Sequence, residues 1–262
     1  MEPIIRNHHN YLISVIIPSK RPEGLNDLIN SILSNSNPLV NNFEIIVKID
    51  FEELNQYDLI QYSNLDNINF IISTKKQGYV SLINFEEDMV KLSNSQYCFL
   101  LTDDTQIITP NWNYILQEQL TEFKVYFPLI EWEDDPINPQ FCFPIFPKKL
   151  LDIWGYLAPH SLVDHWLHEL AKRISNPNMP WNESFLQYLD SIKVHGRKNL
   201  SHETSVDKSS ISSQLYQTCI YHTESPEFFH CINLLKEYLI KRRYDDMHKH
   251  NIINEYKNSL ES

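Results

Sequence analysis

Glycine is scarce in this sequence, with only four residues, Gly24, Gly78, Gly155 and Gly196, among 262. The sequence contains no Gly-x-Gly-x-x-Gly fingerprint and no Walker-type phosphate loop. Those motifs bring backbone N–H groups close to phosphates in dinucleotide-dependent oxidoreductases and P-loop enzymes. The sequence therefore argues against both classes, and its few glycines indicate positions that need unusual dihedral angles or close backbone approach.

Cysteine motifs and long apolar runs are also lacking. The four cysteines show no Cys-x-x-Cys spacing, and Cys98 and Cys142 lie in apolar segments, where a free thiol behaves as a small hydrophobe. The start of the chain has no apolar signal region, and no run approaches the roughly 18 apolar residues that span a bilayer. We therefore expect no zinc knuckle, no disulfide framework and no transmembrane segment, and a soluble protein of the cytoplasm.

Positive charge is in short supply, because 22 Lys and Arg residues face 34 Asp and Glu residues, which gives a formal net charge of -12. A phosphate backbone is normally met by a basic face, so a nucleic-acid partner is not expected. The one dense basic run, residues 241–243, suits the end of a helix, where cations complement the helix dipole.

The first half of the chain alternates strand and helix patterns. Short apolar, β-branched runs predict strands that are buried on both faces, and apolar residues at helical spacing follow them. This alternation is typical of a parallel, doubly wound sheet. The strand-like runs are 11–18, 43–49, 69–73 and the run that begins at Cys98, and the helical patterns cover 25–33, 82–92 and 112–123.

The character of the chain changes after residue 124. The runs 125–128 and 141–147 are aromatic and interrupted by proline, which favours edge strands. A helix is predicted over 163–174, with Ser161 and Asp164 in a capping-box-like start. A strand is predicted over 191–194 and a last helix from Pro226, with its apolar side facing inward.

Acidic residues follow the buried strands of the first half. Asp50 follows one strand, and Asp103 and Asp104 follow the strand that begins at Cys98. In an open α/β sheet this edge is where ligands bind, and carboxylate oxygens suit Mg²⁺ and Mn²⁺. The alternative is a solvated turn, since Asp is a common turn residue.

Four segments, in this order, resemble a family 2 glycosyltransferase of the GT-A fold. They are 14–22, 46–50, 78–84 and 101–105, the last at the position of the family's Asp-x-Asp element. The resemblance covers roughly residues 12–200. It implies an α/β fold of the GT-A type, a Rossmann-like and mostly parallel sheet flanked by helices.

The resemblance also implies a domain organisation and an activity. Residues 1–205 would form the glycosyltransferase domain, with a nucleotide-sugar half over 1–124 and an acceptor half over 125–205, and 206–262 would be a helical C-terminal extension. The activity would be metal-dependent, inverting transfer of a sugar from a nucleoside-diphosphate sugar, with a UDP-sugar favoured, to the hydroxyl of a glycan or other acceptor. Mn²⁺ or Mg²⁺ would be the cofactor.

Individual roles follow from the family's motifs. Asp50 would accept the N–H of the base, and Asp103 would lie by the ribose and phosphates. The metal would be held by Asp104, with His195 approaching it, and Asp164 would be the catalytic base. The remaining residues expected to border the nucleotide are Pro18, Ser19, Arg21 and Gly78.

The sequence departs from the family pattern in three places. Val163 stands where an acid normally accompanies the catalytic Asp, Thr102 replaces the first acid of Asp-x-Asp, and a Gln-x-x-Arg-Trp motif is absent. The last absence argues against a processive polysaccharide synthase. Two other functions stay open: a domain that binds nucleotide sugars or glycans without turnover, and a sugar nucleotidyltransferase, which would normally have a glycine-rich, basic loop after the first strand. Asp164 by itself could simply complement the dipole of its helix.

Overall fold

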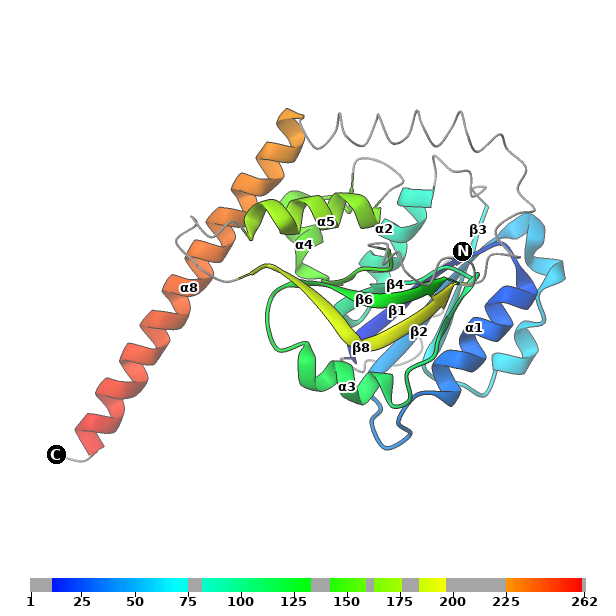
Figure 1. The fold of residues 1–262 in the computed structure, drawn as a ribbon, viewed down its shortest axis with the longest axis horizontal. Coiled ribbons are helices and arrows are strands. Elements are labelled where there is room, and N and C mark those ends of the chain that lie inside the picture. Colours follow the sequence, from blue (N-terminus) through cyan, green and yellow to red (C-terminus); the bar gives the residue numbers. More distant parts are fainter. Residues whose placement is uncertain are drawn as a thin grey trace.

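The computed structural model describes residues 11–74, 82–132, 142–158, 163–175, 184–196 and 225–260, which form a mixed sheet with helices on both faces (Figure 1). The strands are β1 Tyr11–Ser19, β2 Phe43–Asp50, β3 Ile68–Ser73, β4 Ser95–Leu100, β5 Thr105–Ile107, β6 Val125–Trp132, β7 Ile145–Pro147 and β8 Leu186–Gly196. The helices are α1 Pro22–Ser34, α2 Leu82–Leu92, α3 Trp112–Gln119, α4 Lys149–Trp154, α5 Val163–Ile174 and α8 Pro226–Leu260, with the short 3-10 helices η1 Phe51–Gln56 and η2 Leu59–Tyr62.

The strand order in the sheet is β3-β2-β1-β4-β7-β6-β8-β5. The first four strands in this order pair in parallel, as expected for strand–helix–strand units. The strand β7 is antiparallel to both β4 and β6, β6 is parallel to β8, and β5 is antiparallel to β8. The mostly parallel α/β sheet predicted from the sequence is confirmed, with antiparallel pairs in its second half.

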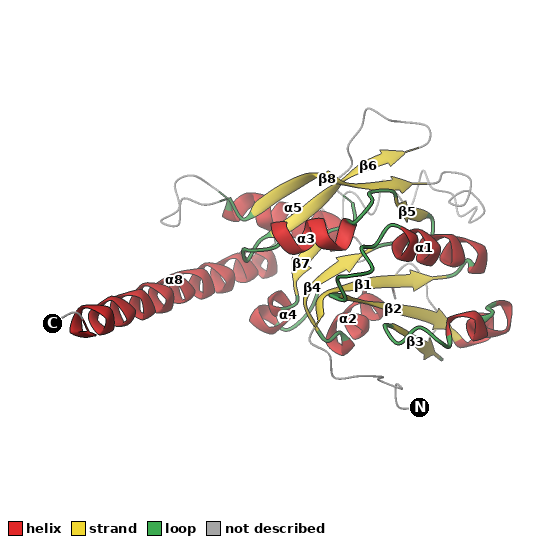
Figure 2. Ribbon diagram, turned by 90° about the horizontal axis from the view of Figure 1, so that it is seen from below, coloured by secondary structure: helices red, strands yellow, loops and turns green. Residues whose placement is uncertain are grey.

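The two faces of the sheet are covered by different helices (Figures 1 and 2). Successive side chains of a strand point to opposite faces. In β1, for example, Val15 belongs to the buried cluster that includes residues of α1 and α3, whereas Ile16 belongs to the cluster that includes residues of α2, α4, α5 and α8. Both faces are therefore apolar, which explains the continuous β-branched runs of β1 and β2.

The structure corrects the prediction that the aromatic runs form edge strands. The strand β7 lies between β4 and β6, and β6 lies between β7 and β8, so both are interior. Proline is tolerated there because Pro128 sits at a bulge, where the register with β8 shifts between Pro128 and Leu129, and Pro147 is the last residue of β7.

Two further boundaries differ from the predictions. The strand β8 has 11 residues and starts at Leu186, earlier than predicted. Its first half gives no apolar strand pattern, because Leu189 is buried there between the exposed residues Tyr188 and Asp190. The helix α8 does not end at 241–243 but continues to Leu260, as Figure 1 shows in orange and red. Ser161, the predicted helix cap, lies outside the described residues.

The first half of α8 belongs to the same core as α4 and α5. Phe228, Cys231, Ile232 and Leu235 are buried, and the Phe228 ring meets Trp166 of α5 edge-on with centroids 4.8 Å apart. The predicted domain boundary near residue 205 falls outside the described residues. No helix in the described part of the chain is long and apolar enough to cross a membrane.

Candidate active site

Asp103 anchors the loop between β1 and α1. Its Oδ2 accepts hydrogen bonds from the Ser19 hydroxyl at 3.0 Å and from the backbone N–H groups of Lys20 and Arg21 at 2.7 and 2.8 Å. Its Oδ1 accepts from Nε and Nη2 of Arg21 at 2.9 and 2.5 Å. Asp103 is buried, so this network compensates a carboxylate withdrawn from water. The carboxyl ends of the neighbouring strands β1 and β4 are thereby tied together.

Asp104 points to the same guanidinium. Its Oδ2 lies 3.3 Å from Nη2 of Arg21, and its Oδ1 accepts from the Thr102 hydroxyl at 2.5 Å. Burial alone would lower the pKa of the Arg21 guanidinium, but the charges and hydrogen bonds of Asp103 and Asp104 outweigh it and raise that pKa. The Thr102 hydroxyl therefore holds Asp104 in place.

Asp50 ends β2 beside the same loop. It is buried, and its charge helps to raise the pKa of Glu53, after burial itself, while Lys20 opposes this. The Tyr57 hydroxyl lies 3.1 Å from the Ser19 hydroxyl, and burial followed by the nearby carboxylates raises its pKa. Tyr57, which the sequence analysis did not single out, thus contacts the strand end that carries Ser19, and Glu53 lies within electrostatic range of Asp50.

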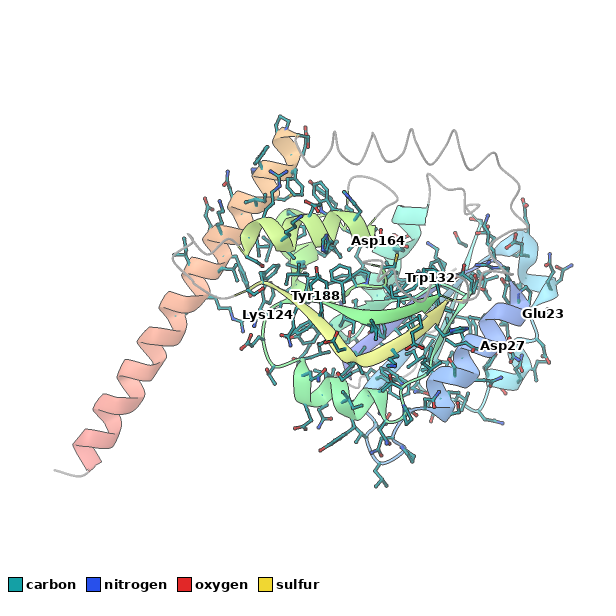
Figure 3. All side chains as sticks on the ribbon, in the orientation of Figure 1. Glu23, Asp27, Lys124, Trp132, Asp164 and Tyr188 are labelled. Atoms are coloured by element: carbon teal, nitrogen blue, oxygen red, sulfur yellow. The ribbon has the colours of Figure 1, made fainter. Side chains whose placement is uncertain are left out.

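Asp164 lies in the first turn of α5, where Figure 3 labels it, and keeps part of its surface exposed. Its Oδ1 accepts the backbone N–H of His165 at 2.8 Å, and its carboxylate accepts the Cys142 thiol. Burial raises the pKa of Asp164, and these two donors oppose the rise. Burial raises the pKa of the Cys142 thiol as well, and the charges of Asp164 and Asp104 add to it. The charges of both carboxylates therefore act on the Cys142 thiol.

Glu86 of α2 is a site residue that the sequence analysis missed. It is 3% exposed, and burial followed by the charge of Asp164 raises its pKa well above the usual 4.5. A signal was present in the sequence: Glu86 precedes the buried Met89 and Val90 by three and four residues. An acid at that spacing lies on the core side of a helix.

His195 lies near the end of β8, opposite Gln106 of β5 and Glu131 of β6. Gln106 is two residues beyond Asp104, so the sheet brings His195 to the same region of the fold. The neighbouring Gly196 is required there, because a Cβ atom at that position would lie 2.3 Å from the Trp132 ring. No other residue fits under that indole.

The structure thus brings most of the predicted residues to one edge of the sheet. Ser19, Arg21, Asp103 and Asp104 form one network, and Pro18 precedes it in β1. Gly78 lies outside the described residues. Within the described ranges, no group of three or more His, Cys, Asp or Glu side chains is arranged to hold a metal ion.

The arrangement has the chemistry to bind a charged, oxygen-rich ligand. Arg21 offers a partly exposed guanidinium, with 32% of its side chain accessible, and Asp104 offers a partly exposed carboxylate. Guanidinium groups match phosphate geometry, and carboxylates suit hard divalent cations. Asp164 adds a carboxylate with a raised pKa, which is the property of a general base.

No protein-family model matches the sequence, and a search of curated proteins found no match. Solved structures do resemble the fold. Crystal structures of S. aureus TarS 1-349, alone and in complex with UDP-GlcNAc, superpose with TM-scores of 0.52 and 0.55 at 16% identity over 71% and 87% of this chain. A structure of GalNAc-T7 with UDP, GalNAc and Mn²⁺ gives 0.52 at 13% identity over 73% of this chain.

The chain spans 60% and 71% of the length of those TarS structures and 44% of the GalNAc-T7 structure. Both neighbours have a fold of the GT-A type. At 13–16% identity the likeness concerns the fold, and it confirms the GT-A-type architecture predicted from the sequence.

Proposed function

We propose that this protein is a glycosyltransferase that moves a sugar from a nucleoside-diphosphate sugar to a hydroxyl group of a glycan or other acceptor. A UDP-sugar is the favoured donor, since structures of the same fold have been solved with UDP-GlcNAc and with UDP. In this proposal the reaction uses a divalent metal and inverts the anomeric configuration.

One observation carries the proposal: after burial, the negative charges of Asp164 and Asp104 both raise the pKa of the Cys142 thiol. Asp104 follows β4 in the first half of the chain, and Asp164 begins α5 in the second half. A group that could hold the leaving diphosphate and a group that could act as base therefore both lie within electrostatic range of one side chain, and Cys142 donates its thiol to the second of them. Transfer chemistry needs these two functions on opposite sides of one sugar carbon.

The donor would lie along the loop after β1. Pro18, Ser19 and Arg21 would border the nucleotide, together with Asp103 and Gly78, and Asp50 would accept the N–H of the base. Because Arg21 already pairs with Asp103 and Asp104, its guanidinium is oriented at the edge where a diphosphate would arrive. A bound diphosphate would share this cation with the two carboxylates.

The described residues fit a metal ion only together with the substrate. Mg²⁺ in such sites is held by one or two carboxylates plus phosphate oxygens, so Asp104 with the donor diphosphate would suffice, and His195 would approach from β8. When bound, Mn²⁺ or Mg²⁺ would neutralise the charge that develops on the leaving diphosphate. The Thr102 hydroxyl would keep Asp104 oriented toward this position.

Asp164 would carry the proton transfer. As the acceptor oxygen forms its bond to the anomeric carbon, the bond from that carbon to the diphosphate oxygen breaks, and the acceptor proton moves to the Asp164 carboxylate. In-line displacement of this kind inverts the anomeric configuration. The raised pKa of Asp164 makes it a stronger base than an ordinary aspartate.

The proposal is tested by UDP release from a panel of UDP-sugars, with and without Mn²⁺, in the wild type and in Asp104→Ala. We expect release that depends on Mn²⁺ in the wild type and falls by at least about tenfold in the variant. Asp152→Ala, which removes an exposed carboxylate of α4, is the matched control. Donor binding without release against any acceptor would instead identify a binding domain, and equal activity in Asp104→Ala would remove the metal role.

A further inference from the structure

A hollow of about 430 Å³ lies at the edge of the sheet opposite to the candidate active site. It is lined by the amino end of β4, the end of β7, the start of α4 and one face of α8. Asp103 and Asp104 follow the carboxyl end of β4, so the length of that strand separates the two places. A second hollow of about 300 Å³ adjoins the first, because both are lined by Ser95, Gln96 and Lys148.

The charges that line the larger hollow are mostly positive, although the chain as a whole is acidic. They belong to Lys148, Lys149, Asp152 and Arg242. Lys149 and Asp152 pair with each other across 3.0 Å on α4, so their charges offset. Neither Lys148 nor Arg242 forms an ion pair with a carboxylate of the described residues. The hollow thus gathers two cations without a described counter-charge in a protein of formal net charge -12.

Arg242 is oriented by stacking on an aromatic ring. Its guanidinium carbon lies 5.2 Å from the centroid of the Phe123 ring. The ring of Tyr238, one turn earlier on the same face of α8, lies 5.1 Å from that of Phe123. A stacked guanidinium keeps its N–H donors in its own plane, at its edge. Within the described part of the chain no acceptor engages these donors, so they are available to a ligand in the hollow.

Lys148 faces the same hollow from the position directly before α4. Its Nζ donates hydrogen bonds to the backbone carbonyl oxygens of Ser93 and Lys91, the second at 3.3 Å. These carbonyls belong to the carboxyl end of α2, whose dipole favours a cation. They fix the ammonium group but leave its charge in place. An anion in the hollow would therefore meet one fixed ammonium and one oriented guanidinium.

We propose that this hollow binds a small phosphorylated ligand of about the size of a sugar phosphate. The planar donors of Arg242 match the oxygens of a phosphate group, and Lys148 adds a point charge. The volume suits a small molecule rather than a polymer. The exposed amide of Gln96, which lines both hollows, offers hydrogen bonds to hydroxyl groups. This site is separate from the proposed donor site and does not rest on the proposed function.

Calorimetric titration of the full chain with glucose 6-phosphate tests the proposal, with glucose as the uncharged comparison. We expect saturable binding of glucose 6-phosphate and no binding of glucose. Arg242→Gln should weaken the binding by about tenfold or more, because a charge-assisted hydrogen bond to phosphate is lost. Arg173→Gln is the matched control and should bind as the wild type does. The Arg173 guanidinium also stacks on a ring, 5.4 Å from the centroid of Phe228, but it does not line the hollow.

Substitutions of Gln96 separate charge from folding. Gln96 is exposed, so the fold should tolerate either charge at this position. Gln96→Glu adds a negative charge to the lining and Gln96→Lys a positive one. The first should weaken and the second should strengthen the binding of glucose 6-phosphate, by about two- to fivefold each. A loss of structure would weaken binding in both variants, so opposite shifts identify the electrostatic effect of the site.

Several outcomes would overturn the proposal. They are no saturable binding of glucose 6-phosphate up to about 10 mM, equal binding by Arg242→Gln and Arg173→Gln, or shifts in the same direction in the two Gln96 variants. Inorganic phosphate that binds as tightly as glucose 6-phosphate would refute the contact with sugar hydroxyls. Binding to phosphatidylglycerol vesicles in place of glucose 6-phosphate would assign the phosphate to a membrane surface and would also refute the proposal. Because no UDP-sugar, metal or acceptor is used, failure of this site and failure of the proposed function are distinguishable.

Discussion

At the residue scale, the site is held by acids whose oxygens are already engaged with protein donors. Asp103 accepts hydrogen bonds from the loop after β1, and Asp104 accepts one from Thr102 and pairs with Arg21. Asp164 accepts hydrogen bonds from Cys142 and from the backbone of α5. These contacts orient the carboxylates before any ligand arrives, which limits the reorganisation that binding requires. One substitution tests how much this network stabilises the fold, and a second tests how it sets the pKa of the proposed base.

Asp103→Asn should destabilise the fold strongly. The amide replaces one acceptor oxygen by an N–H donor that faces other N–H donors, and Arg21 loses its closest counter-charge. Breaking a buried, hydrogen-bonded ion pair from one side costs about 3–5 kcal/mol, which urea unfolding would measure. Asp152→Asn breaks an exposed pair with Lys149 and should change the free energy of unfolding by less than about 0.5 kcal/mol. Similar values for the two variants would show that Asp103 is not an anchor.

Cys142→Ala should move the acidic limb of the pH–rate profile. The thiol hydrogen bond lowers the pKa of Asp164, so its removal raises that pKa, and the base is protonated over a wider range. The acidic limb of the kcat/KM profile should therefore shift to higher pH. The shift should be about half a pH unit if the thiol hydrogen bond contributes less than about 1 kcal/mol. Cys142→Ser keeps a donor and should stay near the wild type. If the acidic limb stays in place in Cys142→Ala, the thiol does not influence the pKa of Asp164.

At the scale of elements, the first half of the sheet and its helices could be predicted from the sequence because their signals are local. The strands β1 and β2 are buried on both faces and read as unbroken apolar runs, and α1 shows a single apolar stripe. The central place of β6 and β7 could not be predicted, since proline favours edge strands, and no local pattern indicates the bulge that accommodates Pro128 inside the sheet. The full length of α8 was missed because a basic run within a helix looks the same as one at its end.

The first turns of α8 should contribute to the stability of the core. Phe228 is fully buried against Trp166, whereas the next residue, Phe229, is 43% exposed on the same helix. Phe228→Ala should lower the free energy of unfolding by about 3–5 kcal/mol, and Phe229→Ala by less than about 1 kcal/mol, as measured in urea. Equal effects of the two substitutions would mean that α8 is not docked through its buried face.

At the scale of the whole molecule, the fold assembles one site from distant parts of the chain. The parallel order of β2, β1 and β4 brings Asp50, Ser19 and Asp103 to a common edge, which strand topology makes predictable. The approach of Glu86 and Cys142 to Asp164 depends on how α2 and the segment before β7 pack against α5. The spacing of Glu86 to Met89 and Val90 indicates only that Glu86 lies on the core side of its helix. Packing between such distant elements leaves no spacing in the sequence, so the electrostatic link of Glu86 and Cys142 to Asp164 emerged only from the structure.

The most direct test of the account is donor turnover by Asp164→Asn, with UDP-sugar affinity measured in parallel by calorimetry. The substitution removes the proton acceptor but keeps size and hydrogen-bonding capacity at a partly exposed position. We predict that kcat falls by about 10²–10⁴-fold while donor affinity stays within a few fold of the wild type. Turnover at the wild-type rate in Asp164→Asn would contradict the account, because the proposed base would then have no part in the reaction.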